Sequence, residues 1–113
     1  MKTTKIVSAR IKSSYYRLIN LGIKKFEVRT ESLEGADAFY FIDDKTDELL
    51  GIRAIEQVFS FDRSEDELVL NLSAICPNDF YRLFPPLDNG GPDRLWVAKL
   101  GQNINLDRLL KSE

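Results

Sequence analysis

The chain has 113 residues, 43% of them hydrophobic, and a formal net charge of −2, which suits one folded domain over residues 1–113 rather than a disordered chain. No apolar run approaches the roughly 20 residues of a membrane span, and no secretory leader precedes the first β-like segment, so we expect a cytoplasmic protein without membrane contact. Histidine is absent and Cys76 is the single cysteine, which excludes the usual zinc ligands; we expect no metal and no cofactor, and a small buried role for Cys76.

The start of the chain predicts a strand, a short helix and a second strand. Residues 5–11 are rich in β-branched side chains and alternate in polarity, as strands do. Residues 13–21 place apolar side chains at helical spacing, and Gly22 stands where a helix end favours a left-handed residue. After Gly22 the period falls to two, so Glu27 and Arg29 are expected on one face of the next strand.

The rest of the chain predicts three more strands and three short helical segments. The long run 48–61 changes its apolar parity near Ala54 and Ile55, which indicates a β-bulge. The other expected strands are 36–42 and 94–100, and the expected helical segments are 64–75, 78–84 and 105–110. Strands dominate, so the expected fold class is mixed α+β, a small β-barrel with short helices covering its openings.

Residues 11–29 carry the most specific pattern in the sequence. Gly22, Lys24, Glu27 and Arg29 follow the spacing Gly-x-Lys-x-x-Glu-x-Arg, with a lysine, Lys12, before the helix. This segment resembles the signature of the ASCH domain (activating signal cointegrator homology), a member of the PUA-like group. The resemblance implies a PUA-like barrel and, because that family is thought to bind RNA, a function in binding RNA or a nucleotide-containing ligand.

The charge distribution agrees with a phosphate-bearing partner without requiring one. Residues 1–29 contain eight Lys or Arg and one acid, a formal charge of +7, whereas residues 30–113 carry −9. A basic surface favours RNA, but a solvated basic helix that binds nothing fits the charge equally well. The acidic remainder leaves room for a protein partner.

The signature supplies the candidate binding residues. Lys12, Lys24 and Arg29 offer cations for phosphate and Glu27 offers a carboxylate. Lys24 and Glu27 converge only if Lys24 lies in the turn before the strand, since a regular strand points them to opposite faces. The alternative is a charge cluster that only tethers the helix to the barrel. Tyr16 is expected off the buried stripe of the helix, as an exposed ring on which a base can stack.

A second function would use the same residues for catalysis. In a small hydrolase acting on RNA or on a modified nucleoside such as N4-acetylcytidine, Lys24 and Glu27 would form the acid/base pair. Both activities are associated with ASCH-like proteins. The acetylcytidine subgroup has a threonine where this chain has Glu27, which argues against that substrate. The sequence does not decide whether the chain is an enzyme.

Overall fold

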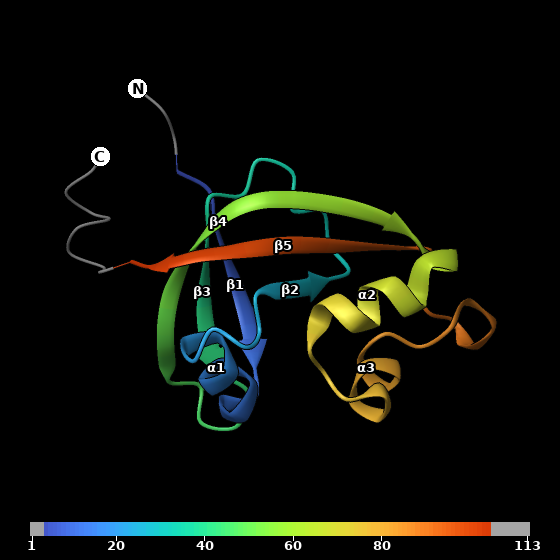
Figure 1. Ribbon diagram of the computed structural model, residues 1–113, viewed down its shortest axis with the longest axis horizontal. Helices are drawn as coiled ribbons and strands as arrows, with labels where there is room; N and C mark the ends of the chain where they lie inside the picture. Colours follow the sequence, from blue (N-terminus) through green and yellow to red (C-terminus); the bar gives the residue numbers. More distant parts are fainter. Residues whose placement is uncertain (1–3, 105–113) are drawn as a thin grey trace.

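The computed structural model describes residues 4–104 as one curled five-stranded sheet with three short helices. The strands are β1 (Ile6–Ile11), β2 (Phe26–Arg29), β3 (Ala38–Asp43), β4 (Leu49–Asp62) and β5 (Arg94–Asn103). The helices are α1 (Ser13–Asn20), α2 (Asp66–Ser73) and α3 (Pro77–Leu83). In Figure 1 the long strands β4 and β5 arch over the molecule, with α1 below β1 and β3 and with α2 and α3 at the other end.

The sheet is a half-barrel, which confirms the predicted mixed α+β class and the barrel-like curl. Its strand order is β1-β3-β4-β5-β2, so β1 and β2 are the two edges. The predicted bulge is present, because the register of β4 against β5 shifts on both sides of Ile55. The last strand runs beyond its predicted end at residue 100, to Asn103, and the predicted segment 105–110 lies outside the described residues.

Two clusters of buried side chains lie on opposite faces of β2 and β5. One fills the inside of the curl: Ala9, Ile11, Tyr16, Ile19, Leu33, Ala36, Phe39, Phe41 and Ala98. The other lies under α2 and α3: Val28, Val69, Phe80, Phe84, Leu95 and Val97. In the register of β2 and β5, Glu27 stands opposite Ala98 of the first cluster, and Val28 stands opposite Val97 of the second. Side chains alternate between the two faces along a strand. Neighbouring residues of β2 therefore face different cores.

The connections on either side of the helices explain one correct and one wrong prediction. Gly22 adopts a φ of +77° just after α1, the left-handed conformation predicted there. Cys76, predicted to be buried, is exposed, because it is the extended residue directly before α3, in the connection between α2 and α3.

No helix within residues 4–104 is long and apolar enough to cross a membrane. Nor does the described part of the chain gather three metal-ligating side chains at one point.

Candidate functional site

A pocket of about 310 Å³ lies where the sheet fails to close, between the edge strands β1 and β2. The end of β1 and the start of α1 form one wall, β2 forms another, and α3 with its flanking residues Ile75 and Phe84 forms the third. Its apolar lining comes from Ile11, Val28, Ile75, Leu83 and Phe84. The pocket therefore joins parts of the chain that are far apart in the sequence.

The charged lining is mixed rather than uniformly basic. Four cations, Arg10, Lys12, Arg29 and Arg82, face the pocket together with three carboxylates, Glu27, Asp44 and Asp79. Of these acids, Glu27 and Asp79 take part in ion pairs with basic side chains. Arg10, Lys12 and Arg29 of the positive N-terminal third also pair with acids from later in the chain, Asp47, Asp79 and Glu31.

Lys24 is fully buried behind the pocket and does not line it. It lies in the turn before β2, as its convergence with Glu27 required, and its Nζ is 3.7 Å from Glu27 Oε1. The ammonium group donates to the carbonyl oxygens of Phe26, at 2.7 Å, and Ser73, at 2.5 Å. Because Ser73 is the last residue of α2, Lys24 joins the C-terminal end of that helix to β2.

Burial shifts the pKa values of this pair toward the neutral forms. Desolvation lowers the pKa of Lys24 below its usual value, although the Glu27 carboxylate opposes the shift. Desolvation also raises the pKa of Glu27, against the opposing charges of Lys24 and Arg29. Arg29 completes the cluster: its Nη1 is 3.6 Å from Glu27 Oε2, and its Nε bonds Glu31 Oε1 at 2.8 Å. Glu27 is thus a buried carboxyl group held by two cations at the pocket wall.

A second polar cluster, centred on Asp79 of α3, closes the pocket against α1. The Asp79 carboxylate accepts from the Tyr15 hydroxyl at 2.5 Å and from Lys12 Nζ at 3.1 Å, and it also pairs with Arg82. The hydrogen bonds from Tyr15 and Lys12 lower the pKa of Asp79 to about 2. Burial, followed by the hydrogen bond to Asp79, raises the pKa of Tyr15. We call these four side chains the Asp79 cluster.

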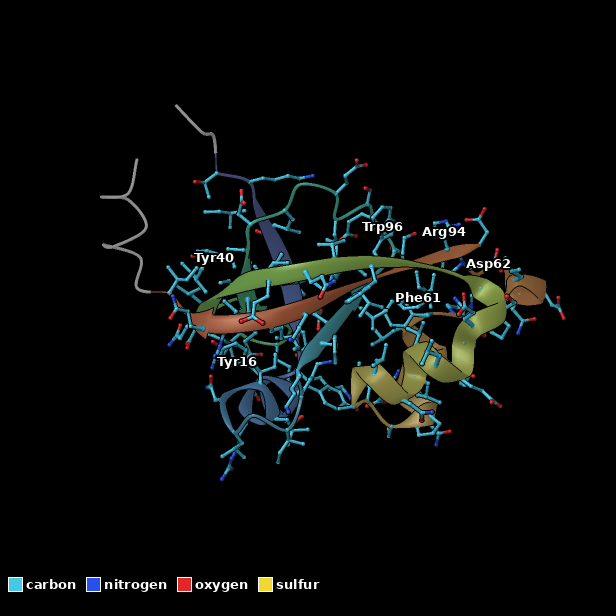
Figure 2. All side chains as sticks on the ribbon, turned by 45° about the horizontal axis from the view of Figure 1, so that its top comes forward. Tyr16, Tyr40, Phe61, Asp62, Arg94 and Trp96 are labelled. Atoms are coloured by element: carbon cyan, nitrogen blue, oxygen red, sulfur yellow. The ribbon has the colours of Figure 1, made fainter. Side chains whose placement is uncertain are left out.

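The structure brings three of the five predicted site residues to the pocket. Lys12, Glu27 and Arg29 line it, whereas Lys24 supports Glu27 from behind. Tyr16 lies elsewhere, and the expectation that it is exposed is wrong. Its ring packs 5.5 Å from Phe41 between α1 and the sheet (Figure 2), and only 5% of the residue is exposed.

Gly51 of β4 shows how closely Tyr16 is fitted into that core. A Cβ at Gly51 would lie 1.9 Å from the Tyr16 hydroxyl, so this glycine makes room for the ring. The neighbouring ring, Tyr15, takes the place at the pocket that was predicted for Tyr16.

Sequence reasoning missed Arg10, Tyr15, Asp79 and Arg82. Asp79 and Arg82 share a helix face at i, i+3 spacing, turned away from the buried Phe80, which is a weak signal for a polar wall. Nothing in the sequence indicates that this face meets Lys12, because 67 residues separate the partners.

Solved structures of an ASCH protein from Zymomonas mobilis have the same fold. Its crystal structure aligns with a TM-score of 0.64 and 15% identity, covering 95% of this chain and 78% of that one. Two mutants of it, one tyrosine-to-phenylalanine and one serine-to-alanine, align with a TM-score of 0.66 and 16% identity. These two matches cover 95% and 98% of this chain, and 80% and 81% of theirs. No protein-family model and no curated protein sequence matches the chain.

Proposed function

Because the chain has the fold of an ASCH domain, as residues 11–29 predicted, we propose that the pocket between β1 and β2 binds RNA or a nucleotide-containing ligand. The observation that carries this proposal is the pairing of partly exposed cations with an apolar wall in one pocket. Cations recognise phosphate, and an apolar wall accepts the face of a base.

The size of the pocket favours a single nucleotide unit over a long strand. Pockets for small molecules span roughly 300–1,000 Å³, and this one, at about 310 Å³, lies at the lower end. One nucleotide of an RNA, or a free nucleotide, would fill it. Longer RNA would continue over the surface outside.

The five predicted site residues have different places in the proposal. Lys12 and Arg29 hold phosphate oxygens, Arg29 through its planar fork and Lys12 as a point charge. Glu27 presents a carboxyl group to a polar edge of the ligand. Lys24 is a positioning residue, because it touches Glu27, β2 and α2 but not the pocket. Tyr16 has no part in binding and acts as a core residue.

The test compares two double variants that remove the same charge. Lys12→Ala with Arg29→Ala removes two pocket cations, whereas Arg17→Ala with Lys25→Ala removes two exposed cations that do not line the pocket. Binding of a fluorescent short RNA and of nucleoside 5′-monophosphates is measured by anisotropy and calorimetry at low salt. We expect the pocket variant to bind at least about tenfold more weakly than the control variant. Equal losses in both variants, or no binding by the wild type, would refute the proposal.

Hydrolysis is a second candidate, and the environment of Glu27 favours it specifically. A carboxyl group with a raised pKa at a pocket wall can donate a proton as a general acid, and only 6% of the Glu27 side chain is exposed. Lys24, whose Nζ bonds two carbonyl oxygens, would act only through Glu27. Acetate release from N4-acetylcytidine and cleavage of short RNAs are assayed with wild type and Glu27→Gln. A product formed by wild type and lost in the variant would establish an enzyme.

A further inference from the structure

The outer edge of β2 forms part of the pocket wall, and the hydrogen bonds of this strand fix the direction of its backbone groups. Lys25 O accepts from Leu100 N at 2.9 Å, which turns the backbone groups of Lys25 toward β5. In an antiparallel pair this direction alternates, so Glu27 and Arg29 also bond to β5. Phe26 and Val28 must therefore turn their N–H and C=O groups away from β5.

The two outward-facing residues of β2 have different surroundings. Phe26 O accepts the bond from Lys24 Nζ, which confirms its outward direction. Val28 comes next and lines the pocket, and within residues 4–104 no strand pairs with this side of β2. Figure 1 shows β2 with β5 above it. Val28 is only 3% exposed, so water has little access to its N–H and C=O groups. A ligand in the pocket that hydrogen-bonds to these two groups would therefore stabilise the complex.

The opposite wall has an edge of the same kind. Ile11 O accepts from Asp44 N at 3.0 Å, on the β3 side of β1. By alternation the preceding residue, Arg10, turns its backbone groups away from β3, and Arg10 lines the pocket. A flat ligand held between β1 and β2 would therefore meet hydrogen-bonding backbone on both sides.

We infer that Val28 is the specificity-determining residue of the pocket, and that its N–H and C=O bond the Watson–Crick edge of an RNA base. This inference rests on the proposed function. An edge of that type places an acceptor next to a donor, which is the complement of the outward N–H and C=O of one strand residue. The cations on the pocket wall place the sugar-phosphate beside the base, which favours a nucleotide over an extended peptide on the same edge.

The first measurement asks whether the base edge is read. Calorimetry compares the four common nucleoside 5′-monophosphates with ribose 5-phosphate. It then compares the best binder with its neutral methylated derivative, in which methyl groups replace every donor hydrogen of the Watson–Crick edge. We expect ribose 5-phosphate and the methylated derivative each to bind at least about tenfold more weakly than the best nucleotide. If the methylated derivative or ribose 5-phosphate binds as tightly, the inference is wrong while the proposed function stands.

The second measurement locates the contact. In ¹⁵N-labelled protein the Val28 amide proton should move downfield and exchange more slowly when the best nucleotide is added, whereas the Ala98 amide, which lies in the β2–β5 ladder, stays unchanged. Unchanged Val28 signals at saturation would overturn the inference. If no nucleotide or RNA binds at all, but a short extended peptide protects Val28, then both the inference and the proposed function fail.

Discussion

Lys24 is the residue whose surroundings depart furthest from those of an ordinary lysine. Its ammonium group satisfies two backbone carbonyls and faces Glu27, and none of its side chain is exposed. Taking a charge out of water is expensive, and partners of good geometry offset that cost. Lys24 therefore joins α2 to β2, whereas the tether that the sequence offered as the alternative to a binding role concerned the helix before Gly22.

Replacing Lys24 should destabilise the protein strongly. Lys24→Met fills similar volume but leaves the carbonyls of Phe26 and Ser73 and the Glu27 carboxyl without their buried donor. We expect a loss of about 3–5 kcal/mol in the free energy of unfolding, measured by urea denaturation. Lys25→Met, at the exposed neighbouring position, serves as the control and should change stability by less than about 0.5 kcal/mol.

Glu27 should make stability depend on pH in a defined direction. Its pKa in the folded protein is raised above the usual 4.5, so the folded state holds its proton to higher pH than the unfolded state. The free energy of unfolding should therefore fall as pH rises from about 4.5 through the raised folded pKa. In Glu27→Gln this decrease should be absent from the same series of urea curves. Parallel curves for the two proteins would contradict the raised pKa.

At the scale of elements, α3 is held against α1 by the Asp79 cluster, and this contact shapes the pocket. Lys12 stands before the first turn of α1 and Tyr15 lies within it, while Asp79 lies in the first turn of α3. Neither helix exceeds eight residues, so each depends on its packing for stability. These side-chain contacts, together with the packing of Phe80 and Phe84 against Val28, hold α3 beside β1 and β2.

The Asp79 cluster should fail in acid. The pKa of Asp79 is lowered to about 2 from its usual 3.8, so the stability from its ionised form is complete above pH 3.8 and is lost as pH falls toward about 2. The wild type should therefore lose stability more steeply over this window than Asp79→Asn does. Asp88→Asn, at an exposed position outside the pocket, should follow the wild type. Far-UV circular dichroism across a pH titration provides the measurement.

At the scale of the whole molecule, folding changes the meaning of the charge distribution. The +7 of residues 1–29 suggests a broad basic surface, yet Arg10, Lys12 and Lys24 pair with Asp47, Asp79 and Glu27. A pocket that offers Lys12 and Arg29 to phosphate should contact few phosphates. The number of phosphate contacts therefore distinguishes a pocket that holds one nucleotide from an extended basic surface that binds many nucleotides of an RNA.

The salt dependence of RNA binding should therefore be shallow. Each phosphate contact with a single strand contributes about −0.7 to the slope of log K against log salt, so we expect a slope of about −1 to −2. Anisotropy titrations at several salt concentrations measure it. A slope near −5 would show that the surface cations, rather than the pocket, carry the binding.

The sequence by itself determined the local features of this protein. Gly22 ends α1, the period of two orients Glu27 and Arg29, and the parity change places the bulge near Ile55, because each follows from residues close together in the chain. The resemblance of residues 11–29 also predicted the fold that the Zymomonas structures share.

Only the tertiary structure decided which side chains meet at the pocket. Tyr15 and Tyr16 are adjacent on a helix of eight residues, and the rotation of α1 against the sheet, set by Phe41 and Gly51, buries Tyr16 and leaves Tyr15 at the pocket. The partnership of Lys12 with Asp79 spans 67 residues of chain. Local periodicity fixes the direction of a side chain relative to its own element, whereas a site between elements depends on packing that no local pattern encodes.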